Sequence, residues 1–577
     1  MGSLQVLSEY FSRAEVEYLA EELSRYHRIQ GSPGLEEAGK FLRDVLTDWG
    51  LEVRVYDLPY SSEAFPTSAP VIGWFVADGY AEVVKPRRRV ISSLRHAWTA
   101  VIAHSPPGEF EGSVCYAPTY RHVAQCRDKV VLTPDWGFDT YVGAVEAGAI
   151  AVIAFRRGAP PTAYPYYGLF PTIRDAGYLK IPALTTTREV AEEIIAQLER
   201  GEEVVVKGYV RSGYREVAYA RVVEASIGRS SEGEYHLVAH YCHPGATVND
   251  NVSGSVGVLS AARAASLAMR EGRLDIKDRS VKFVWVPEHH GTARYLAEVF
   301  REGRRVAGAV NLDMIGEKQC ETGSVLNLVR APIRLLSKLE ASVYSSLMSG
   351  LPRGSSFSSP AEFPLLRFSI INYETGSDHD NYVSLGIPAV MLNQWPDRYY
   401  HTSEDTLEMM NPRLVYSIGV ASLAAVLELE GVRVEPYLHM VYGLDTMRVS
   451  GLPLEARYYL YGKVSRELGV DLKVPEIQPP TSGENVRLVR EGYLTSLYIR
   501  YKLGVDFIRK LREELQDKFR YSMLALAIAG VYLLEGAKDV EKLRFEVSGE
   551  LGVEVPKDVF DTLLDVAESA GYVVRGG

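Results

Sequence analysis

A histidine and an aspartate flank a tight polar turn in the segment AHYCHPGATVNDNVSG, residues 239–254. The apolar run 235–239 before the turn is typical of a buried strand. The run 253–269 after it is rich in Ala, Ser, Val and Leu and predicts a helix packed on that strand. His240 would end the strand and Asp250 would precede the helix. Both side chains would therefore face the crevice at the carboxyl edge of an α/β sheet, where such folds bind ligands.

Three later segments repeat this pattern of an apolar strand that ends in residues able to bind metal. These residues are Glu288, His289 and His290 after the run 281–286, Asp313 after 306–312, and His401 and Asp405 after 387–392. Imidazoles combined with carboxylates suit Zn²⁺, with Mn²⁺ or Co²⁺ as alternatives. A carboxylate that binds no metal could serve as a general base. Any one of these residues could instead be a hydrogen-bonded core or loop residue, but four coincident strand ends favour a metal site.

The order of these residues resembles that of the co-catalytic zinc aminopeptidases related to bacterial leucyl aminopeptidase, glutamate carboxypeptidase and transferrin receptor. The matching motifs are His240, Asp250-Asn251-x-Ser253-Gly254, Glu288, NLDMIG at 311–316, SDH at 377–379 and YHT at 400–402. The segment 27–53 also looks like the helix, glycine turn and edge strand that open that catalytic domain. Together the matches span most of residues 10–60 and 214–430. The resemblance implies a zinc exopeptidase fold, an α/β domain whose mixed central sheet is flanked by helices.

The resemblance also implies a role for each matching residue. Asp250 would bridge two metals, His240 and Asp313 would complete one site, and His401 would help to hold the other. Glu288 would be the general base. One or two Zn²⁺ ions per chain are expected on this basis, with Mn²⁺ or Co²⁺ possible.

Two departures from the family pattern affect the metal ligands. Cys242 stands where the family has an aspartate that orients the first imidazole, and His243 follows it. The family has Glu-Glu at the base and its neighbouring ligand, whereas this sequence has Glu288-His289. A His in place of the ligand Glu is chemically sensible for zinc, so His289 is expected to bind the second metal. The candidates for supporting the ligands or contacting substrate are Cys242, His243, His290, Asp378 and His379, with Asp380 and Asp405 as lesser ones.

The composition fits a large globular enzyme and excludes several classes of partner. A net charge of −11 over 577 residues argues against nucleic acid or an anionic membrane as a partner of the whole chain. Four cysteines without a CxxC motif indicate no disulfide framework. The first 23 residues read as an acidic amphipathic helix and not a secretory signal, and no apolar run reaches about 18 residues. We therefore expect a cytoplasmic protein.

The catalytic domain is predicted to be interrupted by a β-rich insert. Residues 61–212 are rich in Val, Pro, Gly and Tyr, and the segment 141–155 predicts a helix followed by a buried strand. This pattern resembles a protease-associated domain, which in the related enzymes forms a roof over the active site; the alternative is a plain β-rich spacer. The aromatic stretch 164–170 could contact a substrate side chain, although ordinary packing explains it as well.

The C-terminal part resembles a winged helix. Three helices are predicted around 521–534, 540–551 and 557–570, followed by a short strand at 571–574. The third helix carries Asp558, Asp561, Asp565 and Glu568, which would repel phosphates. This charge favours a protein contact, such as formation of a homo-oligomer, over DNA binding. The winged helix also matches an aminopeptidase-like branch of the same clan.

The domains predicted from the sequence are a catalytic domain in two parts, an insert, a linker and a C-terminal module. Their boundaries are 1–60 and 213–432 for the catalytic domain, 61–212 for the insert, 433–520 for the helical linker and 521–577 for the winged-helix-like module. The leading function is a metal-dependent aminopeptidase acting on peptide substrates. The alternatives are another amide hydrolase or a cyclase that uses the same centre, or a non-catalytic binding protein that kept the peptidase fold.

Overall fold

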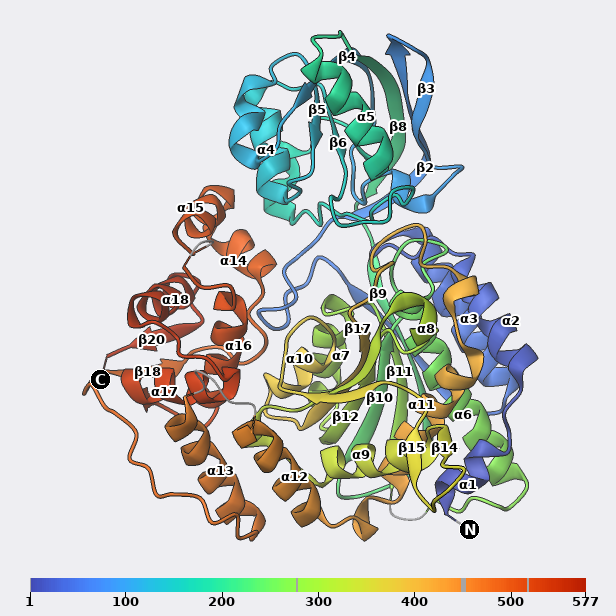
Figure 1. Cartoon of the computed structure of the whole chain (residues 1–577), viewed down its shortest axis with the longest axis vertical. Coiled ribbons are helices and arrows are strands. Elements are labelled where there is room, and N and C mark those ends of the chain that lie inside the picture. Colours follow the sequence, from blue (N-terminus) through green and yellow to red (C-terminus); the bar gives the residue numbers. More distant parts are fainter. Residues whose placement is uncertain (1, 277–278, 448–452, 516–517, 577) are drawn as a thin grey trace.

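The computed structural model describes residues 2–276, 279–447, 453–515 and 518–576, and an eight-stranded mixed sheet lies at its centre (Figure 1). In spatial order the strands are β1 (Glu52–Pro59), β9 (Tyr219–Gly228), β11 (Ser280–Val286), β10 (Glu234–His240), β12 (Val306–Leu312), β17 (Ala389–Trp395), β13 (Val325–Val329) and β16 (Phe368–Ile371). The four middle strands β11, β10, β12 and β17 are parallel. The mixed α/β fold expected from the sequence is therefore confirmed.

Alternate residues of the central strands enter two hydrophobic cores on opposite faces of the sheet. On β11, Phe283 and Trp285 pack into one core, whereas Val284 and Val286 pack into the other. The helices that contribute to the first core are α1 (Ser3–Ser8), α2 (Arg13–Ser24), α3 (Pro33–Asp48), α6 (Gly254–Arg270), α9 (Lys338–Gly350) and α11 (Pro412–Leu427). The second core is covered by α7 (His290–Arg301), α10 (His379–Val383) and the C-terminal helices. Both faces of the sheet are therefore buried, as parallel strands require.

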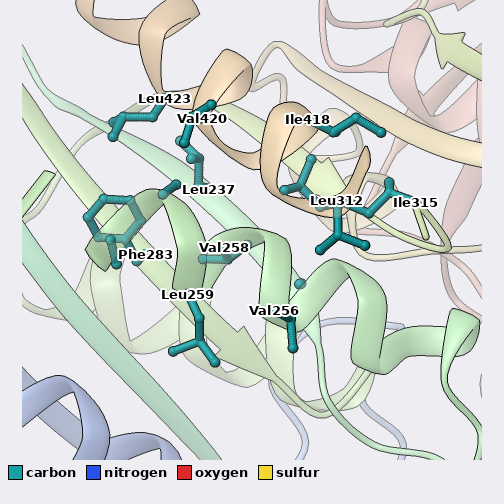
Figure 2. Packing of buried hydrophobic residues seen from close by; sticks show 14 of the residues in the cluster. Leu237, Val256, Val258, Leu259, Phe283, Leu312, Ile315, Ile418, Val420 and Leu423 are labelled. Atoms are coloured by element: carbon teal, nitrogen blue, oxygen red, sulfur yellow. The ribbon is translucent and has the colours of Figure 1, made fainter. Parts of the chain in front are cut away.

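Helix α6 is the central helix of the first core and packs between the sheet and α11 (Figure 2). A Cβ atom built on Gly419 of α11 would lie 2.1 Å from the carbonyl oxygen of Gly257, so these two glycines permit the close helix crossing. Within the described residues, only the helical stretch Asn249–Arg270 is long and apolar enough to cross a membrane. Because 83% of its apolar window is buried inside the fold, it is a core helix.

The insert forms a second sheet that lies above the central one in Figure 1. Its seven strands, in spatial order, are β3 (Arg89–Ser93), β2 (Gly73–Lys85), β8 (Val205–Arg215), β4 (Gly108–Tyr116), β5 (Val130–Thr133), β6 (Ala151–Ala154) and β7 (Ala183–Thr185). Helices α4 (Phe138–Ala147) and α5 (Arg188–Glu199) pack on this sheet. The helix and strand expected within 141–155 correspond to the end of α4 and to β6.

A disulfide in the insert corrects one expectation from the sequence. Cys115 of β4 and Cys126 are bonded, with their Cα atoms 5.5 Å apart, while Cys242 and Cys320 are free. The expectation of no disulfide was wrong because an 11-residue separation does not reveal that the chain folds back beside β4. This disulfide lies within the insert and outside the crevice at the central sheet.

The C-terminal region packs on the second core instead of forming a separate globule. Its helices are α12 (Val434–Met447), α13 (Leu454–Leu468), α14 (Ser496–Leu503), α15 (Val505–Leu515), α16 (Ser522–Leu533), α17 (Val540–Leu551) and α18 (Lys557–Ser569). A small sheet joins β19 (Lys538–Asp539), β18 (Asn485–Leu488) and β20 (Val573–Arg575) in that order. Leu526, Leu543 and Phe560 share one hydrophobic cluster with Tyr295 of α7. The C-terminal region and the central sheet therefore stabilise each other.

Two shorter features complete the described elements. Helix α8 (Gln319–Thr322) follows β12, and the hairpin of β14 (Arg353–Ser355) and β15 (Glu362–Pro364) follows α9. Both lie outside the crevice at the carboxyl ends of the middle strands.

Candidate metal centre

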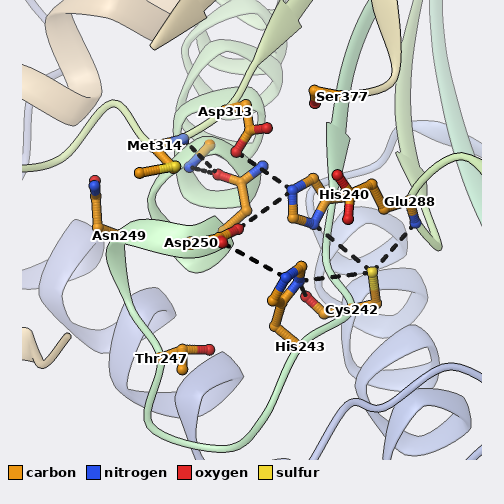
Figure 3. A network of polar contacts seen from close by, with 12 residues as sticks. His240, Cys242, His243, Thr247, Asn249, Asp250, Glu288, Asp313, Met314 and Ser377 are labelled. Atoms are coloured by element: carbon orange, nitrogen blue, oxygen red, sulfur yellow. Dashed lines mark hydrogen bonds and ion pairs between the residues drawn. The ribbon is translucent and has the colours of Figure 1, made fainter. Parts of the chain in front are cut away.

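The carboxyl ends of the four parallel strands bring together the residues singled out in the sequence; Figure 3 shows His240, Asp250, Glu288 and Asp313 among them. His240 is the last residue of β10, Asp313 follows β12 directly, and Glu288 lies two residues beyond β11. His401 belongs to the loop after β17, and Asp250 lies in the turn before α6. Because the strands are parallel neighbours, these five residues meet at one edge of the sheet.

The first cluster of ligand atoms consists of His240, Asp250 and Asp313. The Nε2 atom of His240 lies 3.4 Å from Oδ1 of Asp250 and 3.3 Å from Oδ1 of Asp313. Two ligand atoms at zinc-bonding distance from one tetrahedral ion are separated by roughly 3.3 Å. Neither His240 Nε2 nor Asp313 Oδ1 has a hydrogen-bond partner, although both are buried. The residues therefore fit a metal ion.

A second cluster consists of His243, Asp250 and His401. Oδ2 of Asp250 lies 3.5 Å from Nε2 of His243 and 2.9 Å from Nε2 of His401. One carboxylate oxygen of Asp250 thus faces the first cluster and the other faces the second. A carboxylate placed in this way could bridge two cations.

His289, which the sequence proposed as a ligand, lies apart from both clusters. Its Nε2 atom is 3.9 Å from Oε1 of Glu288, and its ring lies 5.5 Å from the ring of Tyr493. Within the described part of the chain it joins no group of three ligand atoms. His243, considered from the sequence only as a supporting residue, occupies the second cluster. The one signal for this role was the appearance of a histidine next to Cys242, where the family's orienting aspartate is missing.

Glu288 combines partial access to the crevice with a perturbed carboxyl group. About 20% of its side chain is exposed. Burial raises the pKa of the Glu288 carboxyl well above its ordinary value; His240 opposes this shift, whereas the carboxylates of Asp313 and Asp250 add to it. A raised pKa makes a carboxylate a stronger proton acceptor, which suits a general base.

The imidazoles and Asp250 also have shifted pKa values. Burial lowers the pKa of the His243 imidazole to about 3, so its nitrogen lone pair is free. For Asp250, burial favours the neutral acid, but His243, His401 and His240 outweigh it and lower the carboxyl pKa. For His240, burial is outweighed by Glu288 and Asp313, which raise the imidazole pKa. The neighbouring imidazoles thus favour the deprotonated form of the Asp250 carboxyl.

Cys242 and Asp405 contact the candidate ligands on the side away from the metal site and hold them in place. The Sγ atom of Cys242 accepts a hydrogen bond from the Glu288 backbone N at 3.2 Å and lies 3.7 Å from Nδ1 of His240. Cys242 therefore stands in the position where the related enzymes have a carboxylate. The carboxylate of Asp405 accepts from the backbone N of Asn249 at 2.6 Å and of Asp250 at 3.1 Å, which fixes the turn that carries Asp250.

The remaining candidates have local structural contacts. Asp378 accepts from the backbone N of His289 at 2.8 Å and from the hydroxyl of Thr292, so it holds the loop after β11 and not a ligand imidazole. The Nε2 atom of the buried His379 lies 2.9 Å from the Glu374 carbonyl oxygen. Asp380 accepts from the hydroxyl of Tyr373 at 2.7 Å. His290 is buried at the start of α7, and its Nδ1 has no hydrogen-bond partner.

Gly254 permits the close contact between the Asp250 turn and β12. A Cβ atom built on Gly254 would lie 2.0 Å from the carbonyl oxygen of Leu312. The Oδ1 atom of Asn251 accepts from the backbone N of Gly254 at 2.9 Å and of Met314 at 3.0 Å. The DNxSG motif therefore brings Asp250 within reach of Asp313.

Two cavities meet at Glu288 and His289. The first, of about 540 Å³, lies over the clusters, and its other lining residues include Asp250, Asp313, Met314, Glu374, Trp395, Tyr400 and His401. The second, of about 500 Å³, is walled by Phe138 and Phe170 of the insert and by Tyr493, Arg500 and Met523 of the C-terminal region. The crevice is therefore built by all three parts of the chain.

The insert contacts the second cluster directly. The backbone N of Tyr166 donates to the carbonyl oxygen of His401 at 2.7 Å. The Tyr166 ring lies 5.2 Å from the ring of His243 and 5.0 Å from that of His401. The aromatic stretch 164–170 thus packs on the ligand imidazoles.

Comparisons with known proteins agree with this geometry. Residues 222–426 match the model of peptidase family M28, a range that contains every member of both clusters. No curated protein sequence matches the chain.

Solved structures show where the same fold occurs. A putative peptidase from Clostridium acetobutylicum superposes with a TM-score of 0.52 at 15% identity, covering 82% of this chain and 94% of its own. A peptidase M28 precursor from Shewanella amazonensis SB2B superposes with a TM-score of 0.51 at 18% identity. The match covers 72% of this chain and 97% of the precursor. The zinc aminopeptidase BSAP from Bacillus subtilis superposes with a TM-score of 0.50 at 16% identity. The match covers 74% of this chain and 96% of BSAP. At these identities the likeness establishes the fold.

Proposed function

We propose that this chain, whose residues 222–426 match the model of peptidase family M28, is a metal-dependent aminopeptidase that removes N-terminal residues from peptides. The observation that carries the proposal is the shared carboxylate of Asp250. Its two oxygens face separate imidazole clusters, and Glu288 lies beside them. The zinc aminopeptidase BSAP has the same fold, which supports this choice of reaction.

The proposed cofactor is Zn²⁺, one or two ions per chain, with Mn²⁺ or Co²⁺ as alternatives. His240, Asp250 and Asp313 would hold one ion, since their nitrogen and oxygen atoms have the spacing of zinc ligands. A bound ion supplies Lewis acidity and makes water acidic enough to lose a proton near neutral pH.

Glu288 carries the proton in the proposed reaction. Its carboxylate takes a proton from the attacking water as the water oxygen bonds to the carbonyl carbon of the scissile amide. When the C–N bond breaks, Glu288 returns the proton to the leaving nitrogen. The products are a free amino acid and a peptide shorter by one residue, so atoms and charges balance.

The two cavities support release from the N-terminal end. Glu374, which belongs to neither ligand cluster, lines the cavity over them, and its carboxyl group suits an α-ammonium group and would repel a peptide carboxylate. Met314, Trp395 and Tyr400 give the same cavity an apolar wall for a side chain. The N-terminal residue would occupy this cavity, and the rest of the peptide would extend past Glu288 into the second one.

A panel of matched peptides tests this function. One sequence would be supplied with free ends, with an acetylated N-terminus and with an amidated C-terminus, and the products would be identified by mass spectrometry. We expect loss of the N-terminal residue from the free and amidated peptides only, and no activity after chelation until metal is returned. Cleavage of the acetylated peptide, or release of the C-terminal residue, would contradict the proposal.

The same panel separates the alternative functions. Another amide hydrolase would release ammonia from glutamine peptides, and a cyclase would form a product lighter by ammonia or water. A binding protein would retain the free peptide without turnover. These outcomes differ in product mass, so one experiment distinguishes them.

The other proposals concern the parts outside the catalytic sheet. We propose that the insert is a protease-associated domain that roofs the site, supported by the packing of Tyr166 on His243 and His401. We also propose that 521–577 is a winged-helix-like module that mediates homo-oligomer contacts in a cytoplasmic protein. Asp558 and Asp565 on α18 are exposed, as such a contact requires.

Charge reversal tests the oligomer more cleanly than truncation would. Removing 521–577 would strip the second hydrophobic core, because α16 to α18 contribute to it. The double variant Asp558→Lys, Asp565→Lys changes side chains outside that core, although it also breaks their ion pairs with Lys518 and Arg575. We expect it to shift the mass from light scattering to a smaller species, and an unchanged mass would remove the claim of a contact through α18.

A further inference from the structure

The second cluster gives a different ligand set from the one that the Glu288-His289 pair suggests. We propose that His243, Asp250 and His401 bind a second metal ion, and that His289 is not one of its ligands. This inference rests on the proposed metal-dependent function and assigns the second half of its metal centre. The Nε2 atoms of His243 and His401 and a carboxylate oxygen of Asp250 all lie within 4.8 Å of one another. Three protein ligands leave one position open for water or substrate, as catalytic zinc sites require.

The hydrogen bond made by the other ring nitrogen of His243 fixes the direction of its lone pair. Its Nδ1 atom lies 2.6 Å from the carbonyl oxygen of Cys242. A carbonyl oxygen only accepts, so Nδ1 carries the proton and Nε2 presents an unshared pair. That Nε2 atom is the one that points at Asp250, at 3.5 Å. A backbone carbonyl behind a ligand imidazole is a common support in metal sites.

Both histidines of the cluster are held in backbone conformations that non-glycine residues rarely adopt. His243 has a φ of 134° and His401 a φ of 52°. Such conformations persist only where the surrounding structure fixes them, and they concentrate at functional sites. His289 shares this feature, with a φ of 53°, so it marks the whole site; what distinguishes His243 and His401 is that both converge on Oδ2 of Asp250.

Arg28 fixes the backbone of His243. The backbone N and O atoms of the two residues form a reciprocal pair of hydrogen bonds, at 3.0 and 2.9 Å. The buried guanidinium of Arg28 donates to the carbonyl oxygens of Tyr241 at 2.7 Å and Thr247 at 3.3 Å, on either side of His243. Arg28 is therefore a positioning residue for this ligand, which explains a buried arginine within the segment 27–53.

His401 is fixed from the insert. The backbone N of Tyr166 donates to its carbonyl oxygen at 2.7 Å, and the Tyr400 ring stacks on its imidazole with centroids 3.9 Å apart. Its Nε2 atom is directed at Asp250, 2.9 Å away.

His289 is held in a different direction. Its backbone N donates a hydrogen bond to the Asp378 carboxylate, and its ring lies against Tyr493 at the junction of the two cavities. Among the residues that the structure describes, Glu288 is the one carboxylate within ion-pair distance of its ring nitrogens, and Glu288 belongs to neither cluster. The side chain is therefore placed to contact substrate and not to share an ion with Asp250.

Metal stoichiometry tests the assignment without relying on activity. The wild type, His243→Ala, His289→Ala and the matched control His290→Ala would be saturated with zinc, dialysed and analysed by mass spectrometry for bound metal. We expect two zinc equivalents per chain in the wild type and in the variants His289→Ala and His290→Ala. His243→Ala should retain one. Cobalt loading gives a second readout, because His243→Ala should lose about half of the visible absorption of the wild type.

Two results would overturn the inference. The first is that His289→Ala loses one zinc equivalent per chain while His243→Ala keeps two. The second is that the wild type binds one zinc equivalent and that His243→Ala still binds it. Circular dichroism would check the fold of each variant, and His243→Gln would replace the alanine variant if that one does not fold. A wild type that binds no metal at all would instead contradict the proposed function, so the two failures are distinguishable.

Discussion

Two clusters of buried charged groups in this molecule differ in how their charges are balanced. In the metal centre, Asp250, Asp313 and Glu288 converge with histidines. Among the described residues, no lysine or arginine forms an ion pair with any of these three carboxylates. The other group of buried charges lies beneath the C-terminal helices and is called the Arg330 network here. It joins Arg330, Arg457, Asp445, Tyr461 and Glu340. In that network both arginines are paired with Asp445.

The contrast shows how a binding site differs from a structural network of the same composition. The network supplies its own cations: the Nη2 atom of Arg330 lies 2.9 Å from Asp445, and its Nη1 donates to Tyr461 at 3.0 Å. In the metal centre, buried ligand atoms lack hydrogen bonds, and among the described residues no lysine or arginine pairs with its three carboxylates. Burying carboxylates without such a partner is costly, which supports the proposed binding of a cation there.

Breaking the Arg330 network should have the largest effect on stability. Asp445→Ala leaves two buried guanidinium groups without their carboxylate and should lower the free energy of unfolding by about 3–5 kcal/mol. Denaturant unfolding measures this change. Glu17→Ala, which breaks the exposed pair with Arg13, is the matched control and should cost less than about 1 kcal/mol. If the two variants were equally stable, the network would not be the structural element described here.

Glu288→Gln should remove the general base while preserving the metal centre. Loss of a general base typically slows catalysis by roughly a hundredfold or more, equivalent to about 2.7 kcal/mol in the barrier. We expect kcat to fall by at least that factor at unchanged metal content, whereas Glu298→Gln on the outer face of α7 should keep wild-type turnover. A Glu288→Gln protein that lost metal would show that this carboxylate is a ligand.

Glu340 offers a smaller effect that depends on pH. Burial raises the pKa of its carboxyl to about 7, against the lowering influence of Arg330 and Tyr437. The folded protein therefore keeps a proton on Glu340 that the unfolded chain releases above about pH 4.5. The resulting stability is fully present below pH 4.5 and is lost as the pH rises through about 7. Between pH 5.5 and 7.5 the loss amounts to about 2 kcal/mol.

Glu340→Gln tests this pH dependence because the amide cannot ionise. The difference in unfolding free energy between the variant and the wild type should move by about 2 kcal/mol in favour of the variant from pH 5.5 to 7.5. A difference that stays constant over this range would mean that Glu340 does not hold its proton in the folded protein.

Much of the catalytic sheet and its site could be predicted because short-range patterns determine them. Apolar runs followed at once by His240, Glu288 and Asp313 mark strand ends, and parallel strands must bring such ends together. The three C-terminal helices expected around 521–534, 540–551 and 557–570 are also present, as α16, α17 and α18. The domain boundaries inferred from the sequence remain predictions.

The rest depends on contacts that no local pattern encodes. The position of His243 follows from a backbone turn fixed by Arg28, more than two hundred residues earlier in the chain. The Cys115–Cys126 disulfide depends on how the chain returns beside β4. The strand β18 lies in a segment that reads as a linker, and its partners β19 and β20 come from later parts of the chain.

An anomalous difference map collected at the zinc edge, from crystals of the full chain supplied with zinc, tests the central claim most directly. We expect a peak bounded by His240, Asp250 and Asp313, a second bounded by His243, Asp250 and His401, and the disappearance of both below the edge. A map without a peak between His240, Asp250 and Asp313 would contradict the claim that these buried groups form a metal centre.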